Sequence, residues 1–305
     1  MFQKLPTFCD LPYGMPGPGT RAAVIGVPYD CGIHPFRLGS REAPLAVRRA
    51  SRQMRPFHVS QGDFDVLARL GAVDCGDIAL VAGRPLQAFP VIEAAAGVVL
   101  DAGCVPVAIC GDGSGSLPLM RAAGRRHPGM VALHIDSHTD AYVPPDDDPL
   151  DPSTQFTHAA TEGVVDVSRS WHVGIRGFTS MPGIIARATT MGFRVVTTED
   201  LLRRGFAQTM AEFRDNAAGR PVYLCWDMDI FDPAVAPGVC TPTWGGLSAR
   251  EGIELLRACN GLNIVAIDFN TVSPPHDPGD QTAYLCAHMM MEAMLLLCRQ
   301  FGVAQ

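Results

Sequence analysis

Short apolar runs alternate along this chain with segments that carry apolar residues at helical spacing, and this alternation limits the possible folds more than any other feature. The apolar runs have the length of buried strands, and most of the intervening segments are long enough for helices. Strands that alternate with helices form a parallel sheet with helices on both faces. We therefore predict an α/β fold with a mainly parallel central sheet. The predicted strands are residues 22–28, 105–110, 130–135, 171–176, 193–197, 223–226 and 264–268, and the predicted helices include residues 45–51, 86–102, 184–191, 201–217 and 249–259.

The chain has 305 residues, and neither an internal repeat nor a long flexible linker interrupts this pattern. We therefore predict a single domain over residues 21–305. Residues 1–20 are rich in proline and glycine, which predicts an N-terminal arm or surface loop.

Composition argues against several classes of protein. A formal net charge of −7 argues against a general binder of nucleic acids or anionic membranes. The ten cysteines form no Cys-x-x-Cys pair, and several lie in apolar runs, as is typical of buried thiols in a reducing compartment. The first residues do not resemble a signal peptide, and the apolar stretch 283–298 contains His288 and Glu292, which favours a packed helix over a membrane span. We expect a cytoplasmic protein.

Two clusters of acidic residues follow two of the predicted strands. Asp136, His138 and Asp140 come directly after the run 130–135, and their alternate spacing directs them to one side if the backbone stays extended. Asp227 and Asp229 follow the run 223–226 with the same spacing. A single cluster of this kind is most often a solvated turn or a helix cap. Two such clusters at the carboxyl ends of parallel strands favour a site for divalent metal ions, as in two-metal hydrolases.

A glycine-rich stretch at residues 111–116 lies between a predicted strand and a predicted helix, as a phosphate-binding loop would. It has neither the Gly-x-Gly-x-x-Gly fingerprint nor a final Lys-Ser or Lys-Thr. We therefore do not predict a nucleotide site.

Several motifs resemble those of the ureohydrolases, the arginase and agmatinase family. The run Asp136-Ser137-His138-Thr139-Asp140 is similar to the family's Asp-Ala-His-x-Asp, and Asp227-Met228-Asp229-Ile230-Phe231-Asp232-Pro233 is similar to its Asp-x-Asp-x-x-Asp-Pro. The Gly174-Ile175-Arg176 run and Asp268 also match. The resemblance implies a three-layer α/β/α sandwich. It also implies hydrolysis of a guanidinium carbon–nitrogen bond by a metal-bridging hydroxide, in most members on two manganese ions.

The sequence departs from the family pattern at three places. Glycine stands at Gly113, where the family has its first metal-ligating histidine, and Thr271 stands where the family has a glutamate that holds the guanidinium. In the stretch that resembles the family's His-Gly-Thr-x-Phe, Pro152 takes the place of a proton-transfer histidine, and His158 is the nearest substitute.

The residues and the resemblance together give the following site assignments. The predicted metal ligands are Asp136, His138, Asp140, Asp227 and Asp229, the catalytic residues are His158 and Asp140, Thr271 contacts the substrate, and Gly113 marks a lost ligand. The cofactor is one or two divalent ions, Mn²⁺ or Ni²⁺, and we expect occupancy of one ion or fewer per chain at ordinary metal concentrations.

Three functions fit this pattern. The two substitutions at Gly113 and Thr271 favour a subunit with a reduced metal site that assembles with a complete ureohydrolase, similar to metformin hydrolase, which is built from two unlike subunits. The alternatives are an autonomous agmatinase-like hydrolase with an altered metal site, and a non-catalytic structural or regulatory subunit. A metal-dependent deacylase is disfavoured because the motifs are agmatinase-like. The expected partners are a small guanidino compound and further chains in a homo- or hetero-oligomer, in part because the Met- and Leu-rich stretch 283–298 needs to be buried somewhere.

Overall fold

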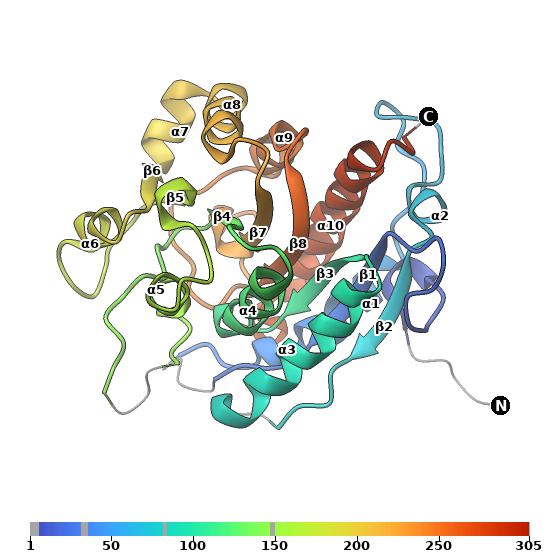
Figure 1. The fold of residues 1–305 in the computed structure, drawn as a ribbon, viewed down its shortest axis with the longest axis horizontal. Helices are drawn as coiled ribbons and strands as arrows, with labels where there is room; N and C mark the ends of the chain where they lie inside the picture. The colour runs from blue at the N-terminus through green and yellow to red at the C-terminus, as the bar shows by residue number, and fades with distance from the viewer. Residues whose placement is uncertain (1–5, 32–35, 82–83, 147–149, 305) are drawn as a thin grey trace.

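The computed structural model describes residues 6–31, 36–81, 84–146 and 150–304, and these form one parallel sheet of eight strands between two layers of helices (Figure 1). The strands lie in the order β2-β1-β3-β8-β7-β4-β5-β6, and every pair of neighbours is parallel. The predicted α/β/α sandwich is therefore confirmed. The strands are β1 (Ala22–Val27), β2 (Val73–Asp77), β3 (Val105–Cys110), β4 (Val131–Ile135), β5 (Trp171–Ile175), β6 (Arg194–Thr197), β7 (Pro221–Asp227) and β8 (Asn263–Asn270).

Two hydrophobic cores lie on opposite faces of the sheet because side chains alternate along each strand. In β1, Val24 belongs to one core, while Ala23 and Ile25 belong to the other. The first core is covered by α1, α2 and α7 to α10, and the second by α3 to α6 (Figure 1). The helices are α1 (Ala43–Ser51), α2 (Val66–Leu70), α3 (Pro85–Asp101), α4 (Ser116–Arg126), α5 (Gln155–Thr161), α6 (Ile184–Thr190), α7 (Thr198–Arg204), α8 (Phe206–Ala217), α9 (Ala249–Ala258) and α10 (Gln281–Gln300).

One expectation about the elements is corrected. The single helix predicted over residues 201–217 is two helices, α7 and α8, because Gly205 has φ 86° and ψ 150°, a conformation that ends a helix. The segment predicted as an N-terminal arm or surface loop contacts the rest of the chain at Phe8, which is fully buried and whose backbone N–H donates to Asp74. Residues 1–5 of that prediction lie outside the described residues.

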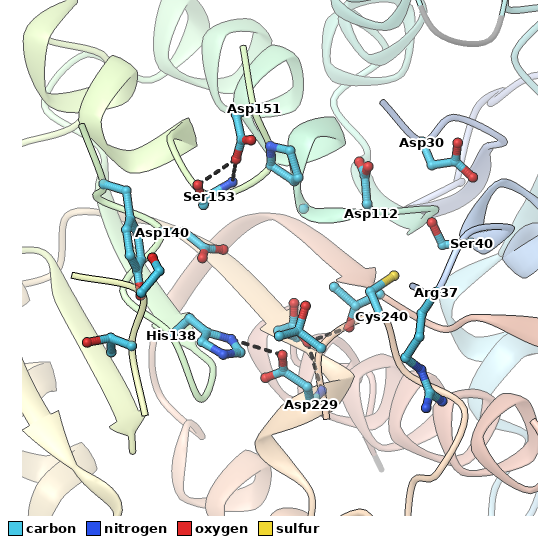
Figure 2. Close-up of a pocket in the computed structure, with 18 of the residues that line it drawn as sticks. Asp30, Arg37, Ser40, Asp112, His138, Asp140, Asp151, Ser153, Asp229 and Cys240 are labelled. Atoms are coloured by element: carbon cyan, nitrogen blue, oxygen red, sulfur yellow. Dashed lines mark hydrogen bonds and ion pairs between the residues drawn. The ribbon is translucent and has the colours of Figure 1, made fainter. Parts of the chain in front are cut away.

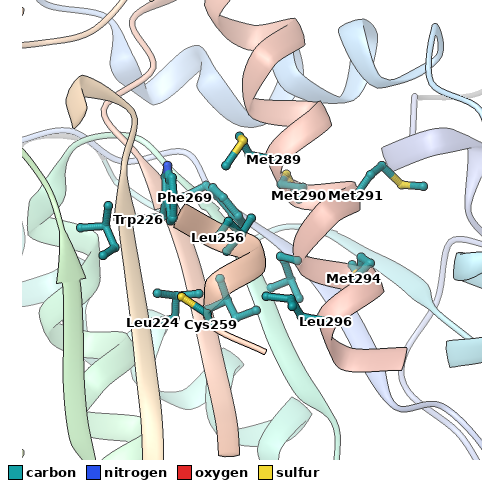
Figure 3. Packing of buried hydrophobic residues seen from close by; sticks show 14 of the residues in the cluster. Leu224, Trp226, Leu256, Cys259, Phe269, Met289, Met290, Met291, Met294 and Leu296 are labelled. Carbon is teal, nitrogen blue, oxygen red and sulfur yellow. The ribbon is translucent and has the colours of Figure 1, made fainter. Parts of the chain in front are cut away.

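Helix α10 is buried within the chain's own first core. Figure 3 shows Met289, Met290 and Met294 of this helix beside Leu256 of α9 and Phe269 of β8. The apolar stretch that was expected to need a partner chain is therefore already covered. No helix in the described part of the chain is long and apolar enough to cross a membrane.

Candidate metal centre

The predicted ligands lie at the carboxyl ends of neighbouring strands in the middle of the sheet. Strands β3, β8, β7 and β4 are adjacent in that order. Asp136 directly follows β4, and Asp227 is the last residue of β7. Because Ile135 pairs with Trp226 in the parallel register, Asp136 and Asp227 leave the sheet at the same level. This edge is where sites form in parallel sheets.

Hydrogen bonds in the loop after β4 fix the first acidic cluster. The Asp136 carboxylate accepts a 2.6 Å hydrogen bond from the backbone N–H of His138. Asp229 accepts bonds from the backbone N–H and the hydroxyl of Ser137, at 3.1 and 2.7 Å. The His138 Nδ1 atom lies 3.1 Å from Asp229 Oδ2 and 3.4 Å from Asp136 Oδ1. The imidazole is thus held between carboxylates from two strands.

The second cluster is formed where β7 turns into the short 3-10 helix η5 (Met228–Ile230). Asp227 Oδ1 accepts a 2.7 Å bond from the backbone N–H of Asp229 and a further bond from the Thr271 hydroxyl. Thr271 follows β8, so residues from two adjacent strands, β7 and β8, meet at this carboxylate.

Strand β5 supports the site from its side. A Cβ atom at Gly174, where φ is 106°, would lie 2.8 Å from the carbonyl oxygen of Asp136, so only glycine fits this close approach. Two residues on, Arg176 Nη2 donates a 2.6 Å bond to the carbonyl oxygen of Asp229. The Gly174-Ile175-Arg176 run therefore packs both acidic clusters in place.

A cavity of about 340 Å³ opens onto these groups, which is the size of a small-molecule site. Figure 2 shows His138 and Asp140 on one side of it, Arg37 on the other, and Asp229 between them. Its lining contains the carboxylates of Asp30, Asp112, Asp140, Asp151, Asp227 and Asp229. This anionic lining suits a cationic ligand.

The protonation of the clusters reflects their burial. Burial, with Asp229 beside it, raises the pKa of Asp136 to about 7. Burial likewise raises the pKa values of Asp140 and Asp227 well above their ordinary range. Burial opposes a charge on His138, but Asp229 and Asp136 still raise its pKa, and His138 lowers the pKa of Asp229 against the effect of burial. Bound cations would relieve this crowding of buried acids.

Among the described residues, two groups of side chains have the geometry to hold a metal ion. The ligand atoms of Asp136, His138 and Asp229 lie within 4.8 Å of one another, and so do those of His134, Asp136 and Asp140. In the second group, His134 Nε2 and Asp136 Oδ2 are buried without a hydrogen-bond partner among the described residues. Imidazole nitrogens and carboxylate oxygens together suit a divalent cation, so the residues present fit one.

Comparison with known proteins agrees with this geometry: the sequence model of the arginase family matches residues 20–296. The chain belongs to the arginase family. It is 38% identical over 302 residues to guanidinopropionase from Pseudomonas aeruginosa, covering 97% of this chain and 92% of that protein. The structure of proclavaminate amidino hydrolase from Streptomyces clavuligerus superposes with a TM-score of 0.92 at 32% identity, covering 97% of this chain and 98% of that one. Formiminoglutamase from Trypanosoma cruzi, solved with Mn²⁺, shares the fold, with a TM-score of 0.85 at 20% identity and coverage of 96% and 98%.

The position of the family's missing histidine is filled from another element. A Cβ atom built at Gly113 would lie 2.7 Å from Gln155 Nε2 and 3.5 Å from Asp140 Oδ2. Gln155, the first residue of α5, donates a 2.6 Å hydrogen bond from Nε2 to Asp140 Oδ2. Its carboxamide therefore occupies the space into which a side chain at residue 113 would extend.

The other two departures have different outcomes. Thr271 lines the cavity, its hydroxyl donates to Asp227, and its φ of 66° is unusual for a β-branched residue. His158 is not among the lining residues of the cavity, and its Nδ1 lies 3.9 Å from Glu162 Oε1 on the same helix. The structure gives no support to the catalytic role predicted for His158.

Three polar residues near the site were missed by the sequence analysis: His134, Gln155 and His172. His134 precedes Asp136 by two residues on the same strand, so the alternation that identified the acidic cluster could also have included it. Nothing in the spacing of Gln155 or His172 links them to Asp140 or His134, because these contacts are made only by the tertiary fold.

Proposed function

We propose that this protein hydrolyses a carbon–nitrogen bond of a small linear guanidino compound and releases urea or a urea derivative. The observation that carries the proposal is the convergence of Asp136, His138 and Asp229, the last two of which line a carboxylate-rich cavity, in a chain that belongs to the arginase family. Divalent ions bound there would lower the pKa of a water molecule and so supply a nucleophile at neutral pH.

The chain's own residues would hold and orient a cationic substrate. The guanidinium carries a positive charge, and the acidic lining of the cavity stabilises it without the family's glutamate at residue 271. Arg37 also lines the cavity (Figure 2); its guanidinium donates to the carbonyl oxygen of Pro237, and its positive charge would attract a carboxylate at the far end of the substrate. We therefore propose a guanidino acid as the substrate class, in agreement with the name of the relative guanidinopropionase.

The test is urea release by the purified chain loaded with Mn²⁺ or Ni²⁺ in separate samples. The panel contains 3-guanidinopropionate, 4-guanidinobutyrate, agmatine and a biguanide. We expect the guanidino acids to be hydrolysed faster than agmatine, and Asp229→Asn to abolish the activity. Urea release that Asp229→Asn leaves unchanged would contradict the proposed site.

A second candidate is a subunit that needs a complete ureohydrolase as its partner. The substitutions at Gly113 and Thr271 support it, since loss of a ligand weakens a metal site. The same assay separates the two candidates: turnover by the isolated chain would exclude a requirement for a partner. If the isolated chain is inactive with either metal on every substrate, the partner-dependent candidate is favoured.

A further inference from the structure

A set of buried polar groups lies on the inner side of the acidic clusters and is not explained by the ligands around His138. It consists of His134 on β4, Gln155 at the start of α5, and the carboxylates of Asp136 and Asp140. His134 is 1% exposed and Gln155 is 2% exposed.

The contacts within this set leave polar atoms unsatisfied. His134 Nε2 lies 2.7 Å from Asp136 Oδ2, yet the contact is not aligned as a hydrogen bond, and neither atom has another hydrogen-bond partner in the described part of the chain. The carboxamide oxygen of Gln155 is also buried without such a partner. Because buried polar atoms without partners are rare in native proteins, the Gln155 oxygen and the poorly aligned His134–Asp136 contact beside Asp140 suit a site for a further ligand.

The imidazole of His134 is oriented like that of a metal ligand. Its Nδ1 atom lies 2.8 Å from Nδ1 of His172, so one of these nitrogens donates to the other. Phe156 packs against the His134 ring with 4.2 Å between the ring centroids, which fixes its plane. When His134 donates from Nδ1, its Nε2 lone pair faces the carboxylates of Asp136 and Asp140, which is the usual arrangement of a ligating histidine and its supporting acceptor.

We propose that His134, Asp136, Asp140 and the carboxamide oxygen of Gln155 form a second divalent-cation subsite that replaces the position lost at Gly113. Rotation of the Gln155 carboxamide by half a turn exchanges Nε2 for Oε1 beside Asp140, and the two orientations have the same shape. Two carboxylates balance one divalent charge, and the imidazole and the carboxamide complete a set of nitrogen and oxygen donors suited to Mn²⁺.

The role of this subsite in hydrolysis rests on the proposed function, but cation binding there does not. The competing explanation is structural: His134 donates from Nε2 to Asp136 and only orients that carboxylate. The two explanations differ in the number of ions bound, because an orienting histidine adds no binding site.

The experiment is a titration of the metal-free full chain with Mn²⁺, monitored by calorimetry. Elemental analysis after equilibrium dialysis against millimolar Mn²⁺ gives the number of bound ions independently. We expect the wild-type chain to bind two ions, the second at least about 10-fold more weakly because the family's imidazole is absent. The variants His134→Phe and Gln155→Leu should each bind one ion with the affinity of the stronger site unchanged. Gln208→Leu makes the same chemical change on the exposed face of α8 and should still bind two ions.

A wild-type chain that binds only one ion at saturation would overturn the proposal. Retention of the second ion by either His134→Phe or Gln155→Leu would overturn it as well. Circular dichroism establishes that each variant is folded, and Gln155→Leu alone carries the test if His134→Phe fails to fold. Urea release is measured separately. Two bound ions without turnover would support the subsite and contradict the proposed function. Turnover with only one bound ion would support the proposed function and contradict the subsite.

Discussion

The family's histidine at the position of Gly113 and the Gln155 carboxamide would occupy the same space. Gly113 lies in the 3-10 helix η3 (Gly113–Gly115) without a left-handed φ, so its backbone would accept another residue. The nearest obstacle is Gln155, whose Nε2 atom would lie 2.7 Å from a Cβ atom at residue 113, and the carbonyl oxygen of Pro152 would lie at 3.3 Å. The glycine and the glutamine therefore form one matched pair.

The first prediction follows from this pair. Gly113→His alone should lower the free energy of unfolding by about 1–3 kcal/mol, as overpacked buried sites do, without strengthening Mn²⁺ binding. With Gln155→Ala added, the imidazole has room, and the weaker Mn²⁺ site should tighten by about 10-fold or more. Chemical denaturation and Mn²⁺ titration measure the two effects. A gain in Mn²⁺ affinity from Gly113→His alone would show that Gln155 does not block the position.

A second prediction concerns Thr271, which lines the cavity and donates to Asp227. Thr271→Glu places a carboxylate where the family holds the substrate guanidinium, so it should lower KM for guanidino substrates by about tenfold, the equivalent of about 1.4 kcal/mol, with a smaller change in kcat. Steady-state kinetics of urea release measures both constants. Thr271→Gln is the matched neutral control, and an equal decrease in KM with glutamine would exclude the charge as the cause.

At the scale of elements, the sequence predicted what depends on local pattern. The apolar runs predicted β4 and β7, and the spacing of Asp136, His138 and Asp227 placed the candidate ligands at their carboxyl ends. The position of Gln155 beside Asp140 could not be predicted, because α5 reaches Asp140 only through the tertiary fold. The break between α7 and α8 was missed because the amphipathic pattern continues across Gly205.

Gly205 gives the third prediction. Its φ of 86° and ψ of 150° are accessible almost only to glycine, and a Cβ atom there would meet nothing within 4 Å. Gly205→Ala should therefore lower the free energy of unfolding by about 1–3 kcal/mol through backbone strain alone. Gly17 is equally open and has no left-handed φ, so Gly17→Ala is the matched control and should change stability by less than about 0.5 kcal/mol. Equal effects in urea denaturation would contradict a role for the backbone conformation.

For the whole molecule, association with further chains remains a prediction, but its physical reason changes. Helix α10 is covered by the chain's own core, whereas the large apolar side chains of Phe178 and Trp244 are 104% and 73% exposed. Exposed aromatic side chains of this size favour burial in an interface. Light scattering after size exclusion should therefore give a multiple of 32.6 kDa, and the double variant Phe178→Ser with Trp244→Ser should shift it toward the single chain. A wild-type mass of one chain at micromolar concentration would contradict the prediction.

The place of β8 in the sheet has a consequence for biosynthesis. This strand follows the seven others in the sequence, yet it lies between β3 and β7, in the middle of the sheet. The half of the sheet that ends with β3 and the half that begins with β7 therefore stay unjoined until residues 263–270 have been made, and in that interval the edges of both strands are exposed. Because Gly113 follows β3 and Asp227 ends β7, the two walls of the cavity come together only when β8 is inserted. The nascent chain thus completes this cavity late, in a step that is slow because it closes contacts between distant parts of the chain.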